Sequence, residues 1–177
     1  MRPSRQHDLQ DLVAFSHATL TRATRAAWTK RLGRFFGHGH TGRRIVDMGG
    51  SHQPVAFAQL QRLQADVRTL IRQAVDVQAL RVGHAHSPQA VQFDGPLEVA
   101  VLPLGRRPLL LVDGTPADRF RYHATQVLVA GGLERLRRCP SPPCETIFVR
   151  VGKRLYCSAR CQARAYMRTY APGAAGE

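Results

Sequence analysis

The four cysteines of this 177-residue chain all lie between positions 139 and 161, and no other feature limits the fold as strongly. They form two close pairs, Cys-x4-Cys and Cys-x3-Cys, on either side of residues 145–156: Cys139, Cys144, Cys157 and Cys161. Zinc binds four thiolates at the corners of a tetrahedron, and two short-spaced pairs on separate elements can supply that arrangement. Two disulfides, free thiols and an iron–sulfur cluster are the alternatives.

The expected compartment favours a metal over disulfides. The opening residues MRPSRQHDLQ carry charge without the apolar run that a secretory signal requires. No stretch approaches the ~20 apolar residues of a membrane helix. We therefore expect a cytoplasmic protein with no membrane partner. Structural disulfides are rare in the cytoplasm. Four-cysteine frames of this size mostly hold zinc rather than iron–sulfur clusters. Four protein ligands leave no position for water, which predicts one structural Zn²⁺ per chain.

The residues between the cysteines predict a hairpin. The prolines of PSPP at 140–143 favour a tight knuckle that points two thiolates at one centre. Residues 146–150 (TIFVR) and 154–156 (RLY) have the composition of strands, and residues 151–153 can join them as a turn. We therefore expect a β-hairpin between the two cysteine pairs.

A helix is expected to follow the second pair. Ser158 is a candidate N-cap, and the residues up to Tyr170 have good helix propensity. Met167 and Tyr170 are expected to pack on the hairpin. Knuckle, β-hairpin and helix together predict a small treble-clef-like zinc-binding module.

The charge of the chain predicts a polyanionic partner. Lys and Arg number 26 against 12 Asp and Glu, which gives a formal net charge of +14. Nucleic acid, most readily double-stranded DNA, is the expected partner. Between Glu134 and Tyr170 there are nine basic residues and two glutamates, a net of +7 that one Zn²⁺ and four thiolates reduce to about +5. A generally arginine-rich coding bias is the alternative explanation.

Six basic side chains of the module are the candidate nucleic-acid contacts. Three recur every fourth residue of the predicted helix and share one face, and three lie around the predicted hairpin turn. A helix of this kind suits phosphate contacts and entry into a major groove, whereas a solvated arginine face is the alternative. The six residues are Arg150, Lys153, Arg154, Arg160, Arg164 and Arg168.

The N-terminal part of the chain predicts a mixed domain. Residues 8–36 have helical periodicity, and residues 37–54 have the glycine and histidine content of a loop. The clearest amphipathic stripe comes next, and burial within its own domain is its expected use, with a dimerising seam as the alternative. This stripe consists of Leu60, Leu63, Val67, Leu70, Ala74 and Val77.

A hairpin and a capped helix complete this domain. Apolar runs at 97–104 and 109–112 predict two adjacent strands. Thr115 can then cap a helix that begins at Pro116, with Asp118 as its capping partner. The predicted fold class is α+β, divided into an N-terminal domain at 1–132, a zinc module at 133–170 and a disordered tail at 171–177.

Two other functional classes compete with nucleic-acid binding. For an enzyme, paired histidines could supply ligands and Asp113 or His123 could supply acid–base chemistry. No phosphate loop, nucleophile elbow or helical His-Glu-x-x-His motif accompanies them, so we do not expect an enzyme. A sensor or interaction module, in which the N-terminal domain binds a ligand or forms a homodimer, is the second alternative. The paired histidines are His38 with His40 and His84 with His86.

The segment RLRRCPSPPC…YCSARCQARAYMRTY resembles the CGNR zinc-finger domain, which occurs at the C-terminus of bacterial stress-induced transcriptional regulators behind an ABATE domain. The resemblance covers about 40 residues, from Leu133 to Tyr170, and it matches all four cysteines and the motif arginine, Arg164. Gln162 and Ala163 stand where the family has Gly-Asn. The resemblance implies zinc binding, DNA binding and regulation of transcription. An RNA-binding or protein-interaction zinc module is the alternative.

Overall fold

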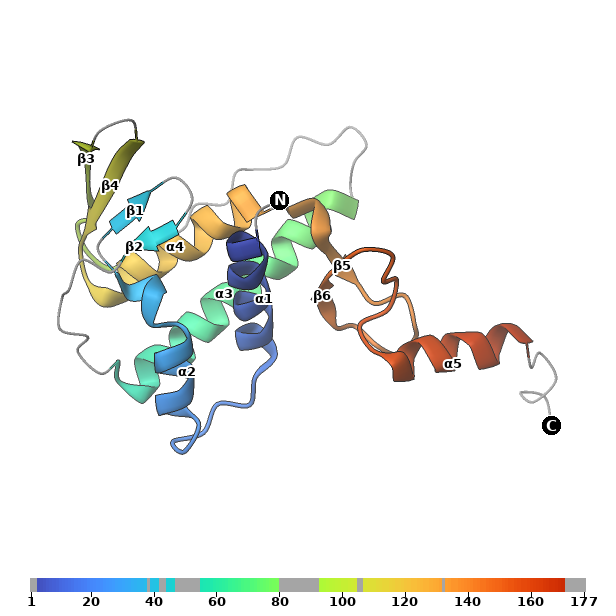
Figure 1. The fold of residues 1–177 in the computed structure, drawn as a ribbon. Coiled ribbons are helices and arrows are strands. Elements are labelled where there is room, and N and C mark those ends of the chain that lie inside the picture. Colours follow the sequence, from blue (N-terminus) through green and yellow to red (C-terminus); the bar gives the residue numbers. More distant parts are fainter. Residues whose placement is uncertain are drawn as a thin grey trace.

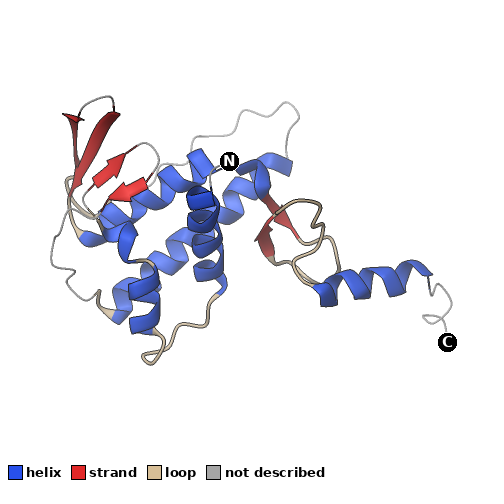
Figure 2. Cartoon of the chain, in the orientation of Figure 1, coloured by secondary structure: helices blue, strands red, loops and turns tan. Residues whose placement is uncertain are grey.

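The computed structural model describes residues 3–37, 39–41, 44–46, 55–79, 93–104, 107–131 and 133–170. Helices accompany two small antiparallel sheets in these residues, which agrees with the α+β class (Figure 1, Figure 2). The α-helices are α1 (Pro3–His17), α2 (Arg25–Arg31), α3 (Phe57–Ala79), α4 (Pro116–Gly131) and α5 (Ala159–Tyr170), with 3₁₀ turns at Gly33–Phe36 and Leu133–Arg135. The strands are β1 (Gly39–Thr41), β2 (Arg44–Val46), β3 (Glu98–Leu104), β4 (Arg107–Asp113), β5 (Leu136–Arg138) and β6 (Ile147–Val149).

The larger sheet contains the predicted hairpin. β3 and β4 pair antiparallel from Glu98 opposite Asp113 to Leu104 opposite Arg107. β1 and β2 extend this sheet in the order β2-β1-β4-β3. The prediction of a loop at 37–54 was therefore wrong where these two strands form. Three-residue strands carry too little alternation to be recognised, and β1 depends on β4, which lies far along the chain.

The single helical stretch predicted at 8–36 was also wrong, because the chain leaves the helix after His17. Thr21 and Thr24 exchange hydrogen bonds, with the Thr21 amide donating to Thr24 Oγ1 at 2.9 Å and the Thr24 amide to Thr21 Oγ1 at 3.1 Å. This reciprocal pattern resembles a capping box, and it closes the turn that leads into a new helix, α2, at Arg25. Local hydroxyl bonds of this kind compete with a continuous helix.

The core lies between α1, α3 and α4. The stripe predicted on α3 is buried at Leu60, Leu63 and Val67, which confirms burial within its own domain. Further along α3 it runs through Ile71 and Val75, whereas the predicted Leu70 and Ala74 are partly buried. The Val77 side chain lies outside the described residues. A homodimer through this domain stays a prediction.

The predicted cap of α4 is confirmed and connects to an ionic cluster around the buried side chain of Arg121. The Asp118 amide donates to Thr115 Oγ1 at 3.2 Å, and the Thr115 hydroxyl donates to Asp118 Oδ2 at 2.7 Å. Arg121 bridges Asp118 to Asp66 of α3 and to Asp94. These carboxylates hold the pKa of Arg121 above its usual range against the cost of burying its charge. The cluster fixes α4 against α3 and the segment before β3.

The prediction of a hairpin between the cysteine pairs was wrong, because the strand at 147–149 pairs with a different segment. β6 pairs antiparallel with β5, which precedes the first cysteine, whereas residues 154–156 are not a strand. The two faces of β6 differ: Ile147 and Val149 join the main core, and Phe148 packs against the cysteines. Successive side chains of a strand point to opposite faces, so β6 contacts the main core with one face and the cysteines with the other. This strand therefore connects the zinc module to the body.

Polar contacts reinforce this junction. β6 lies against α1, where His17 Nε2 is 3.0 Å from the Ile147 carbonyl oxygen. β5 lies against α3, and Arg138 forms a 2.7 Å ion pair with Asp76. α5 then extends away from the body (Figure 1). Division into domains at residue 132 stays a prediction, and the tail at 171–177 lies outside the described residues. Among the described helices, none has both the length and the apolar character needed to cross a membrane.

Candidate metal centre and basic helix

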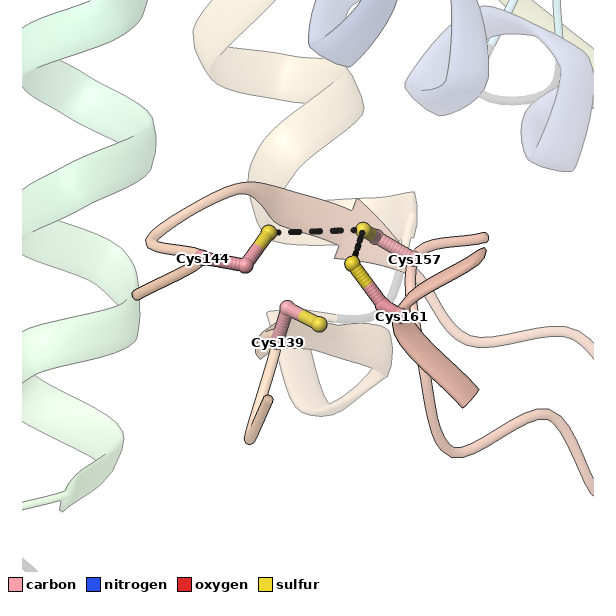
Figure 3. A group of neighbouring side chains, drawn as sticks. All are labelled: Cys139, Cys144, Cys157 and Cys161. Atoms are coloured by element: carbon pink, nitrogen blue, oxygen red, sulfur yellow. Dashed lines mark hydrogen bonds between the residues drawn. The ribbon is translucent and has the colours of Figure 1, made fainter. Parts of the chain in front are cut away.

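The four cysteines meet at the junction between the β5–β6 hairpin and α5. Their sulfur atoms all lie within 4.8 Å of one another, and Figure 3 shows the side chains turned toward a shared space. Cys139 directly follows β5, and Cys144 closes the turn that leads to β6. Cys157 precedes α5, and Cys161 lies in its first turn. The structure thus brings together the complete predicted ligand set.

Backbone hydrogen bonds position the first pair. The Cys139 amide donates to the Thr146 carbonyl at 2.9 Å, which extends the hairpin ladder by one step. The Cys144 amide donates to the Ser141 carbonyl at 2.8 Å, which closes the tight knuckle that the prolines predicted. These two backbone hydrogen bonds hold both cysteines of the first pair in place.

The helix cap positions the second pair. Ser158 Oγ accepts a 3.2 Å hydrogen bond from the Cys161 amide, which confirms the predicted N-cap of α5. Arg154 holds the segment in front of it, because its guanidinium donates to the Tyr156 carbonyl at 2.8 Å and to the Cys157 carbonyl. The same guanidinium lies 5.7 Å from the centre of the Phe148 ring.

The sulfur separations distinguish between the chemical alternatives. Cys157 Sγ lies 3.6 Å from Cys144 Sγ and 3.5 Å from Cys161 Sγ. A disulfide needs about 2.05 Å, and all four cysteines are free thiols. Four sulfurs at about 2.3 Å from one tetrahedral zinc lie about 3.8 Å apart, close to what is observed. An iron–sulfur cluster places several atoms between its cysteines and needs a wider cage.

The electrostatics of the cluster also fit a cation. Hydrogen bonds from the Thr146 hydroxyl and amide lower the pKa of Cys144 to about 6. Burial, together with the neighbouring thiols, raises the pKa of Cys157 to about 12. Without a cation, repulsion between neighbouring thiolates keeps some of the four thiols protonated. A divalent metal stabilises all four as thiolates. The four cysteines are therefore the ligands of one zinc ion, and they leave no open coordination position.

The comparison with protein families agrees with this geometry. The model of the CGNR zinc finger matches residues 135–172. These residues form a CGNR zinc finger. No curated protein and no solved structure matches the chain. An ABATE domain in the preceding residues stays a prediction.

The zinc finger exposes most of the predicted nucleic-acid contacts. Residues 146–170 contain six basic residues and no Asp or Glu. Arg164 is half-buried, and Arg154 is exposed but engaged with the two carbonyl groups described above. The other four are exposed, and none has a carboxylate partner among the described residues: Arg150, Lys153, Arg160 and Arg168.

The apolar side chains of α5 differ from the prediction. Met167 was expected to pack on the hairpin, but its side chain is 63% exposed, and Tyr166 beside it is 60% exposed. α5 leads away from β5 and β6, so residues beyond its first turns have no hairpin to cover them (Figure 1). The side chain of Tyr170 lies outside the described residues.

The residues considered for an enzyme are not brought together where they are described. The Asp113 side chain is 78% exposed at the end of β4. His123 is fully buried in α4, with Nε2 at 2.9 Å from the Gly37 carbonyl oxygen. Three of the remaining candidates lie outside the described residues: His38, His84 and His86. His40 belongs to β1, but its side chain lies outside the described part of the structure.

Sequence reasoning missed three residues that support the site. Thr146 forms a hydrogen bond with the Cys144 sulfur, and Phe148 packs against the cysteines. Arg154 donates a hydrogen bond to the Cys157 carbonyl and so holds the segment before the second cysteine pair. A hydroxyl residue two positions after a ligand was the only available signal for Thr146. Nothing in the pattern of RLY indicated that its arginine would bond to nearby carbonyls.

Proposed function

We propose that this protein is a zinc-dependent DNA-binding protein and a regulator of transcription, in which the CGNR zinc finger presents α5 to double-stranded DNA. We interpret its knuckle, hairpin and helix as a treble-clef-like arrangement. The proposal places the protein in the cytoplasm and assigns it no catalytic activity.

The observation that carries the proposal is the contrast between the basic residues of residues 146–170 and those basic residues of the body that form ion pairs. In the body, Arg31 and Arg34 pair with Asp8 and Asp11, and Arg121 pairs with three carboxylates. These charges are neutralised within the fold. In residues 146–170 there is no Asp or Glu side chain, so the six basic charges of this segment remain available to an external anion.

The shape of α5 supports DNA as that anion. A helix of 12 residues is about 18 Å long and, with side chains, about 10–12 Å wide, which matches a major groove about 12 Å wide. Arg160, Arg164 and Arg168 follow one another at about 6 Å along the axis and span about 80° of its circumference. Such a stripe can contact successive phosphates, with Arg164 as the candidate for a guanine contact.

The test is the salt dependence of binding to a 30-bp duplex. Replacing Arg160, Arg164 and Arg168 together by Ala should weaken binding about a hundredfold and lower the salt slope by about three phosphate contacts. The matched control replaces Arg22, Arg25 and Lys30, three exposed basic residues of the body, and removes the same charge. We expect the control to change affinity far less.

Two results would redirect the proposal. Equal losses in the two triple variants would mean that overall charge, and not α5, drives binding. Tighter binding to an RNA hairpin than to the duplex would favour the RNA-binding alternative, and duplex affinity unchanged in the α5 variant would favour a protein-interaction module.

A further inference from the structure

Met167 is an apolar side chain at an unexpected place on the zinc finger. Single exposed apolar residues are normal on protein surfaces, so exposure alone means little. Its position carries the information, because α5, a helix of 12 residues, has the arginine stripe along one side and no arginine on the other. The question is therefore which of these sides holds Met167.

Helical geometry places Met167 on the arginine side. At about 100° per residue, Met167 points about 20° from Arg160, about 60° from Arg164 and about 100° from Arg168, which places it beside the Arg160 edge of the stripe. Along the axis it lies between Arg164 and Arg168. Tyr166 has nearly the same exposure but points about 120° from Arg160. A polyanion that docks on the arginines covers Met167 and leaves Tyr166 at the margin or in solvent.

We propose that Met167 makes an apolar contact with base edges in the major groove, at the flank of the arginine stripe. This inference rests on the proposed function. Arginines at the walls of the groove contact phosphates, and the apolar group that the groove offers at its floor is the C5-methyl of thymine. A methionine is flexible and polarizable, so it adapts to such a surface without fixed hydrogen-bond geometry. The contact releases no counterions and is independent of salt.

The experiment compares two neighbouring substitutions on α5. Met167→Ala should bind a 20-bp duplex of alternating adenine and thymine about tenfold more weakly than the wild type at every salt concentration, with the same salt slope. Tyr166→Ala, which removes a side chain of similar exposure, should stay within about twofold of wild type. Both changes increase helix propensity, and circular dichroism with zinc analysis confirms that each variant is folded.

A second duplex with deoxyuridine in place of thymine tests the base contact itself. The wild type should bind it about threefold more weakly, whereas Met167→Ala should bind both duplexes equally. Equal wild-type affinity for the two duplexes overturns the base contact, as does Met167→Ala with normal affinity or Tyr166→Ala with an equal loss. Failure of the proposed function looks different, because the triple arginine variant would then bind the duplex normally.

Discussion

Replacing Ile147 by Ala should destabilise the body of the protein, although Ile147 lies within the zinc finger. Its side chain is 3% exposed and belongs to the main core formed with α1, α3 and α4. Truncating a buried isoleucine in such a core costs about 3 kcal/mol. For a chain of this length, that loss lowers the midpoint of thermal unfolding by about 6–12 °C.

The matched control is the next residue of the same strand. Phe148 is also buried, but it faces Cys139 and Cys161 on the opposite side of β6. Phe148→Ala should therefore accelerate zinc loss to a chelator more than Ile147→Ala does. Helical ellipticity at 222 nm measures the body, and a colorimetric chelator measures zinc release.

The result that would refute this reasoning is specific. If Ile147→Ala leaves the midpoint of the helical transition of the zinc-loaded protein unchanged, β6 is not docked on the body. The zinc finger would then be an independent unit joined to the body by a linker.

Two further predictions concern side chains around the metal. In zinc-stripped protein at pH 7, which lies above the lowered pKa of Cys144 and below the raised pKa of Cys157, iodoacetamide should alkylate Cys144 first. Peptide mass spectrometry should show that this preference declines below about pH 6, and equal rates for the two cysteines would contradict the assigned environments. The second prediction concerns Arg154→Ala, which should weaken zinc retention because the carbonyls of Tyr156 and Cys157 lose their donor. The control, Lys153→Ala, should leave zinc retention unchanged and weaken DNA binding slightly. A larger loss of DNA affinity than of zinc retention in Arg154→Ala would assign its guanidinium to phosphate instead.

The metal ligands could be predicted from the sequence because their signal is local. Each cysteine pair is separated by only three or four residues, and the capping serine directly follows the third cysteine. Thr115 and Asp118 were predictable for the same reason, since both partners of the cap lie within one turn. In each case the geometry depends on little outside the segment.

The hairpin could not be predicted because its pairing depends on the body. Residues 147–149 have the composition of a strand, but their partner is decided by Ile147 and Val149 entering a core that α1 provides. Residues 154–156 have a similar composition, yet Arg154 bonds to carbonyls two and three residues ahead and the segment does not form a strand. Tertiary burial thus decides the pairing of the first segment and local hydrogen bonds the conformation of the second, whereas β-propensity decides neither.

The dependence of DNA binding on zinc tests the central claim most directly, because it connects the four thiolates to the surface of α5. Fluorescence anisotropy with a 30-bp duplex should be measured on the purified protein, on the protein stripped with a chelator, and on stripped protein resupplied with Zn²⁺ or with Mg²⁺. We expect stripping to weaken binding at least tenfold and Zn²⁺, but not Mg²⁺, to restore it, because Mg²⁺ does not bind thiolates. Equal affinity of the stripped and zinc-loaded proteins for the duplex would contradict the account.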